Sequence, residues 1–84
     1  MIGDSMIHVK LTGEFAKLAP EGNDKGSFDI EYESGITISQ LLERFAVKER
    51  GIKYSVMVNN SRKPEDYVMV DSDSLLIIPL LAGG

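Results

Sequence analysis

Residues 35–45 read Gly-Ile-Thr-Ile-Ser-Gln-Leu-Leu-Glu-Arg-Phe and carry the signals of one well-bounded helix. Thr37 can cap the N-terminus, and Gln40, three residues later, completes a capping box. Ile36 and Leu41 have the spacing of a hydrophobic staple. Apolar residues then recur at helical spacing and form one apolar stripe, made of Ile38, Leu41, Leu42 and Phe45.

The predicted end of this helix is Gly51. Lys48 and Arg50 would face the negative end of the helix dipole. Gly51 can adopt the left-handed conformation that closes a helix, with Ile52 packing back near Val47. We therefore expect a single helix of about three turns.

Four segments around the helix predict β-strands. Residues 6–11 and 28–32 alternate apolar and polar side chains, as half-buried strands do, and the polar loop between them makes a hairpin pair. Residues 54–58 show the same alternation. Residues 75–81 are almost wholly apolar, apart from Pro79, which predicts a strand buried on both faces.

The connections between these segments carry turn signals. Residues 15–18 form a short turn within the first connection, and Asn59-Asn60 tolerates positive φ in a tight turn. Pro64 argues against a central strand in residues 61–70. Residues 71–74 predict another turn.

The order of elements predicts an α+β domain in which one main helix covers a mixed four- to five-stranded sheet. The apolar last strand should lie centrally, beside the first, and this arrangement is the ubiquitin-like β-grasp. Residues 1–84 would form one such domain, with a flexible N-terminal extension over residues 1–5 and a flexible tail over residues 82–84. Met57 and Met69 are expected to fill the core. The predicted core consists of Ile7, Val9, Leu11, Phe28, Ile30, Leu41, Leu42, Phe45, Val56, Val58 and Ile77.

Composition limits the function. The chain has 84 residues, 43% of them hydrophobic and 26% charged, which is typical of one globular domain. The net charge of −4 and the isoelectric point near 4.8 argue against nucleic-acid binding. No apolar stretch is long enough to cross a bilayer, and the N-terminus lacks signal-peptide features. We expect a cytoplasmic protein, monomeric when free, that binds neither nucleic acid nor membrane.

Cysteine is absent, which excludes disulfides, cysteine-based zinc sites and a cysteine nucleophile. No Gly-rich phosphate loop is present, so the chain is not expected to bind ATP alone. We also expect no cofactor and no enzymatic activity of its own. His8 is the only histidine and lies on the polar face of its strand, which favours an exposed residue over a metal ligand.

Two pairs of carboxylates are expected to be solvated rather than catalytic. Asp71 and Asp73 lack the glycine and distal glutamate of a calcium loop, so we interpret them as a solvated turn. Glu31 and Glu33 share one face at strand spacing, with nothing to bury them. We predict no catalytic residues and no metal ligands.

The final residues, Gly83-Gly84, are the strongest candidate for chemistry. A carboxylate is a poor electrophile, and adenylation supplies a leaving group. A tail that threads into a narrow nucleotide site benefits from glycine, which lacks a Cβ and allows any φ. The alternatives are a frayed end and a vector-derived remnant.

Several segments together resemble the MoaD/ThiS group of ubiquitin-like sulfur-carrier proteins. The resemblance spans residues 6–84, and its specific part is the Gly-Gly terminus after this order of strands. The segments are Val9-Lys10-Leu11, Phe15-Ala16-Lys17-Leu18-Ala19, Gly35-Ile36-Thr37-Ile38-Ser39-Gln40-Leu41-Leu42, Val56-Met57-Val58-Asn59, Val70-Asp71-Ser72-Asp73, Leu75-Leu76-Ile77-Ile78-Pro79 and Ala82-Gly83-Gly84.

This resemblance implies a mechanism and partners. A separate ATP-dependent adenylyltransferase would activate the Gly84 carboxylate, with Ala82 and Gly83 as the tail. The product would be a thiocarboxylate that gives sulfur to a synthase, such as the large subunit of molybdopterin synthase. Molybdopterin is favoured over thiamin because ThiS-like chains tend to be shorter. In modifier relatives the tail instead forms an amide with lysines of target proteins.

Three positions depart from the usual family pattern. Ser72 stands where glycine is usual, Leu80 where a second proline often follows, and Thr12 where an aromatic residue is common. The fold expectation is unaffected.

Two questions stay open at the level of sequence. Leu80 and Leu81, next to Pro79, either dock the activating enzyme or finish the last strand inside the core. The chain is either a sulfur carrier, a protein modifier, or a non-catalytic interaction domain with an inert tail, because the first two functions use the same activated carboxylate.

Overall fold

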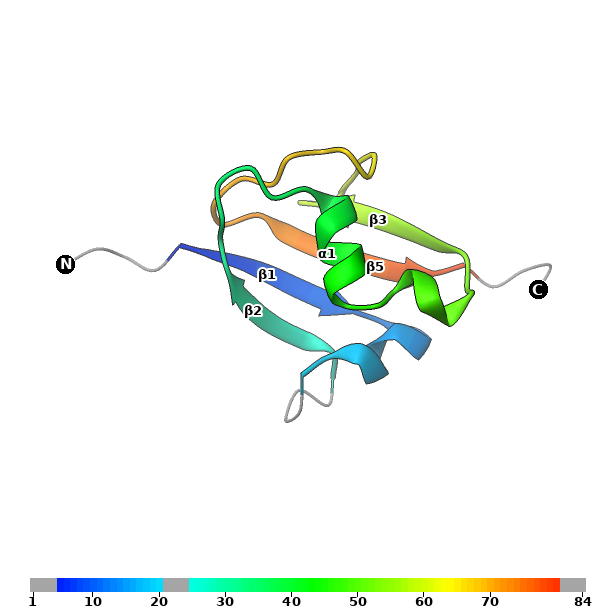
Figure 1. Ribbon diagram of the computed structural model, residues 1–84. Coiled ribbons are helices and arrows are strands. Elements are labelled where there is room, and N and C mark those ends of the chain that lie inside the picture. The colour runs from blue at the N-terminus through cyan, green and yellow to red at the C-terminus, as the bar shows by residue number, and fades with distance from the viewer. Residues whose placement is uncertain (1–4, 21–24, 81–84) are drawn as a thin grey trace.

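A computed structural model describes residues 5–20 and 25–80 and shows a curved sheet with its main helix across one face (Figure 1). This arrangement confirms the predicted β-grasp. In chain order the elements are β1 (Met6–Leu11), the 3-10 helix η1 (Gly13–Leu18), β2 (Ser27–Glu31), α1 (Ile38–Arg44), the 3-10 helix η2 (Lys48–Arg50), β3 (Tyr54–Val58), β4 (Ser61–Arg62) and β5 (Ser74–Pro79).

The five strands of the sheet lie in the order β2-β1-β5-β3-β4. The first and last strands are parallel, with Val9 opposite Leu75, while β2, β3 and β4 pair antiparallel with their neighbours. The last strand is therefore central, as predicted. Its burial differs from the prediction, because Leu76 and Ile78 point to the face opposite α1 and are only half-buried.

The core lies between α1 and the inner face of the sheet. Fourteen hydrophobic residues in the described part of the chain form it, and Phe15, Ile36, Ile38, Val47 and Leu75 join the predicted set. Met69 is buried in it, as predicted. Phe28, Ile30 and Phe45 are only partly buried at its margin, which corrects their assignment to the core. Met57 is also misplaced by the prediction, because it alternates with the buried Val56 and Val58 and so faces outward.

The predicted N-terminal cap of α1 is present. The Thr37 hydroxyl accepts a hydrogen bond from the Gln40 N–H at 3.2 Å, and the Gln40 side chain accepts one from the Thr37 N–H at 2.9 Å. This capping box begins the helix where the polypeptide leaves the end of β2.

The predicted C-terminal end of α1 is wrong. The helix ends at Arg44 because Ala46 adopts φ 60°, and Gly51, at φ 69°, closes only the short η2. The Val47 N–H bonds to the Leu42 carbonyl at 3.0 Å, and the Ala46 N–H to the Glu43 carbonyl at 3.1 Å. These are the two bonds of a Schellman motif, and they place Val47 in the core.

Asp73 is a further correction, because the predicted solvated turn holds a buried carboxylate. Only 6% of Asp73 is exposed. Its oxygens accept hydrogen bonds from the Asn59 side-chain amide, the Tyr67 hydroxyl and the Val70 N–H, at 2.8, 3.1 and 2.8 Å. Burial and this hydrogen bond raise the pKa of Tyr67. The turn before β5 is thus fixed to the turn after β3, with Ser72 at φ 73°.

The N-terminal extension is described only at Ser5, whose carbonyl accepts a hydrogen bond from the Tyr32 N–H at 2.9 Å. Residues 1–4 lie outside the described residues, so the predicted flexibility of residues 1–5 stays a prediction.

Ala46→Gly should stabilise the fold. A left-handed alanine costs about 1–2 kcal/mol, and glycine removes this cost while losing part of it to unfolded-state entropy. We expect the free energy of unfolding to rise by about 0.5–1 kcal/mol in urea denaturation. Ala16→Gly, within η1, is the matched control and should lower it by a similar amount. A loss of stability in the Ala46→Gly variant would contradict the proposed helix end.

Candidate functional site

The end of β5 is held from both sides where the tail begins. On one side Pro79 packs against Gly13, where an added Cβ would lie 2.6 Å from the Pro79 Cγ. On the other side the Leu80 N–H donates to the Lys53 carbonyl at 2.8 Å. The tail therefore starts from a fixed point between η1 and β3.

Of the predicted partner-binding residues, two are described. Pro79 is half-buried at the end of β5, and Leu80 follows the strand with 45% of its surface exposed. Leu80 therefore does not finish the strand inside the core. Leu81 lies outside the described residues, as do the predicted tail, Ala82 and Gly83, and the predicted acceptor, Gly84.

A cleft of about 240 Å³ lies beside Leu80. It is lined by Tyr54, Ser55, Val56, Arg62, Lys63, Pro64, Glu65 and Leu80. Arg62 and Lys63 bring positive charge to this cleft, although the chain is acidic overall.

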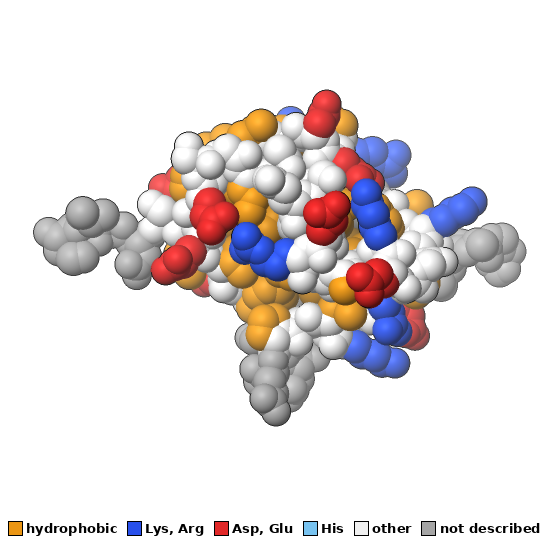
Figure 2. All heavy atoms as spheres, in the orientation of Figure 1, with side chains coloured by type: hydrophobic (Ala, Val, Ile, Leu, Met, Phe, Trp, Pro, Cys, Tyr) orange, Lys and Arg blue, Asp and Glu red, His pale blue; other side chains and the backbone are white. Residues whose placement is uncertain are grey.

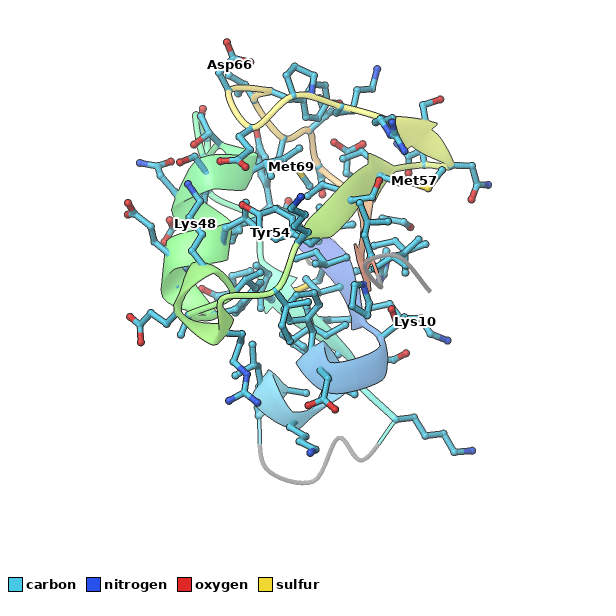
Figure 3. The ribbon with its side chains drawn as sticks, turned by 90° about the vertical axis from the view of Figure 1, so that its right-hand side faces the viewer. Lys10, Lys48, Tyr54, Met57, Asp66 and Met69 are labelled. Carbon is cyan, nitrogen blue, oxygen red and sulfur yellow. The ribbon has the colours of Figure 1, made fainter. Side chains whose placement is uncertain are left out.

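Three polar side chains brace one wall of the cleft. Glu65 accepts a hydrogen bond from the Tyr54 hydroxyl at 2.8 Å and pairs with Lys48 of η2 at 2.9 Å. Figure 3 shows the side chains of Lys48 and Tyr54 on the same side of the molecule. The hydrogen bonds from Lys48 and Tyr54 lower the pKa of Glu65. Burial of the Tyr54 ring raises the pKa of its hydroxyl to about 12, and the hydrogen bond to the Glu65 carboxylate is the second cause. This group ties the start of β3 to the segment that follows α1, and sequence periodicity contains no signal for it.

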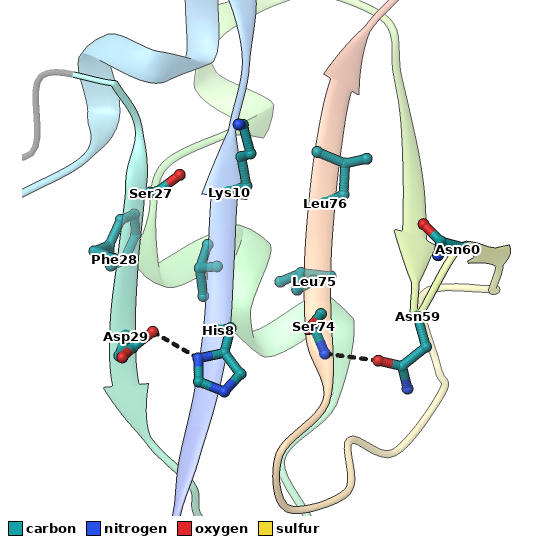
Figure 4. A pocket seen from close by; sticks show the side chains of 11 residues that line it. His8, Lys10, Ser27, Phe28, Asp29, Asn59, Asn60, Ser74, Leu75 and Leu76 are labelled. Atoms are coloured by element: carbon teal, nitrogen blue, oxygen red, sulfur yellow. Dashed lines mark hydrogen bonds and ion pairs between the residues drawn. The ribbon is translucent and has the colours of Figure 1, made fainter.

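The outer face of the sheet carries a half-buried apolar strip next to this site. Met57 of β3 lies directly opposite Leu76 of β5, and Ile78 continues the strip toward Leu80. Among the described residues no element covers this face (Figure 4). These half-buried residues extend the apolar surface around Leu80, and sequence reasoning did not identify them.

A groove of about 520 Å³ crosses the same face between β2 and the β3–β4 turn. His8 lies in it, 54% exposed, and its Nδ1 is 2.8 Å from the Asp29 carboxylate (Figure 4). The prediction that His8 is an exposed strand residue is confirmed. Within residues 5–20 and 25–80, no cluster of three or more metal-ligating side chains is present.

No protein-family model matches the chain, and no curated protein matches its sequence. Solved structures do resemble it. Small archaeal modifier protein 1 from Haloferax volcanii aligns with a TM-score of 0.71 and 14% identity, over 92% of this chain and 99% of that one. A putative molybdopterin converting factor, subunit 1, from Pyrococcus furiosus aligns with a TM-score of 0.72 and 19% identity, over 92% and 99%.

Urm1 from Trypanosoma brucei aligns over all of both chains, with a TM-score of 0.72 and 18% identity. At these identities the likeness is one of fold, and that fold is the ubiquitin-like β-grasp. No helix in the described ranges has both the length and the apolar character needed to cross a bilayer.

Tyr54 should make stability depend on alkaline pH. Its folded pKa of about 12 exceeds the unfolded value of 10.0, so its contribution is complete below pH 10 and is lost between about pH 10 and 12. Tyr54→Phe should therefore lose less stability over this range, as measured by urea denaturation at a series of pH values. Equal declines in both proteins would show that folding does not raise the pKa of Tyr54.

Proposed function

We propose that this chain is a sulfur carrier whose Gly84 carboxylate is adenylated by a separate ATP-dependent enzyme and becomes a thiocarboxylate. The observation that supports it most is the position of Gly83-Gly84 in the sequence, just beyond the anchored end of the central strand of a β-grasp sheet. The proposal requires that the mature chain ends at Gly84.

The chemistry needs no catalytic group on this chain. A Gly84 carboxylate oxygen attacks the α-phosphate of ATP, and the bond to pyrophosphate breaks. A hydrosulfide equivalent supplied by the partner then attacks the acyl carbon, and AMP leaves with the oxygen. The product carries sulfur in place of one carboxylate oxygen, and one proton is released from the sulfur.

The fold supports this role because it limits how many residues the activating enzyme must fix on binding. Fixing one backbone residue costs about 1–2 kcal/mol. Because Leu80 is already held by Lys53, the partner would have to fix at most the residues from Leu81 to Gly84. Extended, those residues would reach at most about 14 Å, enough to enter a nucleotide site.

The partners follow from the same reasoning. We propose that the activating enzyme docks on Leu80, Leu81 and the outer apolar strip of Met57, Leu76 and Ile78. The sulfur acceptor would be a synthase, with molybdopterin synthesis favoured over thiamin synthesis. The fold shared with the putative molybdopterin converting factor supports this choice. The cysteine-free sequence suits a cytoplasmic location.

The second candidate is a protein modifier joined through Gly84 to lysines of target proteins. The fold shared with small archaeal modifier protein 1 favours it. Trypsin digestion of proteins from the native cell distinguishes the two. Because no lysine or arginine follows Lys63, a modifier leaves branched peptides in which a long C-terminal segment of this chain, ending in Gly84, is attached to the target lysine. A carrier leaves none.

Changes at the tail should abolish activation. Deleting Gly84 moves the carboxylate back by about 3.5 Å, and Gly83→Val adds bulk where the tail enters the nucleotide site. Each should reduce ATP–pyrophosphate exchange by the cognate enzyme at least about a hundredfold, without changing thermal unfolding. Ala82→Gly neither changes the length of the tail nor adds bulk to it, so this control should support ATP–pyrophosphate exchange normally. If the chain without Gly84 exchanges as well as the intact chain, the interaction-domain function should replace both candidates.

Docking is tested separately. Replacing Leu80 and Leu81 together with serine should weaken binding to the activating enzyme about tenfold or more, because an exposed apolar anchor is lost. The matched control replaces Val68 and Val70 with serine. These valines are 50% and 55% exposed, but they lie before the turn that leads to β5 and so away from the tail end of that strand. Calorimetry should find the control unchanged. Unchanged binding of the folded leucine variant would remove the docking role.

A further inference from the structure

The strand β2 forms one edge of the sheet, and no described strand pairs with the backbone groups on its outer side. At its two ends the Leu11 N–H bonds to the Gly26 carbonyl at 2.8 Å, and the Tyr32 N–H to the Ser5 carbonyl at 2.9 Å. Along an antiparallel pair, hydrogen-bonded and non-hydrogen-bonded residues alternate. Every second residue of β2 between these ends therefore points its backbone N–H and C=O away from β1. The residues whose backbone groups point outward are Ser27, Asp29 and Glu31.

The opposite edge of the sheet does not offer the same surface. There β4 comprises only Ser61 and Arg62, and Pro64 follows shortly after. Short strands and prolines are devices that protect an edge from pairing. β2 has five residues, no proline and no bulge in its register with β1. The edge at β2 is therefore the one that can accept another strand.

A groove of about 520 Å³ runs along this edge, between Pro20 and the strand. The side chains of Phe28 and Ile30 line it on the helix side of the sheet. Phe28 packs edge-on against Phe45, with the two ring centroids 5.4 Å apart. Figure 2 shows hydrophobic side chains at the surface between α1 and β2. Alternate apolar side chains of an added strand would fit against this margin.

The negative charge on β2 indicates what kind of strand can bind there. Asp29 and Glu31 are exposed on the outer face of β2, and in the described part of the chain Glu31 makes no ion pair. Pairing of β2 with a second copy of itself would place these carboxylates across from one another, and like charges directly opposite are destabilising. Lysine or arginine at alternate positions of a different chain would meet them favourably.

We propose that the outer edge of β2 binds an extended segment of a partner protein in which basic and apolar side chains alternate. The segment adds a strand to the sheet, with its basic side chains on the Asp29 and Glu31 face and its apolar side chains against Phe28 and Ile30. This surface goes beyond the proposed function, because β1 separates it from β5 and the tail. A partner can therefore occupy it while Leu80 stays accessible.

The test is a titration with a short peptide of alternating lysine and valine, blocked at both ends, followed in amide NMR spectra. The amide signals of Ser27, Asp29 and Glu31 should shift most, and their hydrogen exchange should slow about tenfold or more as new hydrogen bonds form. A peptide of alternating glutamate and valine should not bind. A lysine–valine peptide methylated on alternate backbone nitrogens should not bind either, because it cannot pair with the edge.

Variants test the charge argument. Glu31→Lys should weaken binding of the lysine–valine peptide about three- to tenfold, as expected for reversal of a surface pair. Glu43→Lys, on the exposed face of α1, changes the net charge equally and should bind normally. Any of three results would overturn the proposal: no shifts at roughly millimolar peptide, shifts centred on β3 and β5, or equal binding of the methylated peptide.

Discussion

The parallel pairing of β1 with β5 is the constraint on which the rest of this structure depends. Parallel neighbours cannot be joined by a tight turn, so the chain between them must cross over one face of the sheet. That crossing carries α1, and α1 supplies the apolar face that closes the core. Because β5 lies between β1 and β3, the chain leaves the domain at the centre of one end of the sheet.

This central exit explains the composition of the candidate site. An end at the sheet margin would have one neighbour, whereas Pro79 and Leu80 have η1 on one side and the start of β3 on the other. The Tyr54–Glu65–Lys48 group then fixes the start of β3 to the segment beyond α1. Asp73 fixes the opposite end of β5. Both ends of the central strand are thus held by polar groups, while its middle is held by the core.

The sequence predicted those parts of the fold that depend on local pattern. The capping box of Thr37 and Gln40 is a short-range signal, and the alternation in β1 and β3 is another. The end of α1 was missed because Ala46 is not a residue that favours the left-handed region. It adopts that conformation because Val47 is drawn into the core, which is a tertiary effect. Asp73 was missed for a related reason, since its burial depends on packing: the Asn59 amide comes from a distant turn, and the Tyr67 hydroxyl and Val70 N–H come from the irregular segment just before it.

The candidate site was predictable in part. The Gly83-Gly84 end and the pair of leucines are readable in the sequence, and the exposure of Leu80 agrees with one of the two roles considered for it. The cleft beside Leu80 could not be predicted, because Glu65 lies in an irregular segment whose position depends on packing.

The central claim is that the Gly84 carboxylate is the group that carries sulfur. It is tested most directly by intact-mass and fragment-mass measurement of the protein purified from its native cell. The account predicts a population in which one sulfur replaces one oxygen, with the change confined to the fragment that ends in Gly84. A mature chain that continues beyond Gly84, or a sulfur-containing fragment elsewhere in the chain, would contradict it.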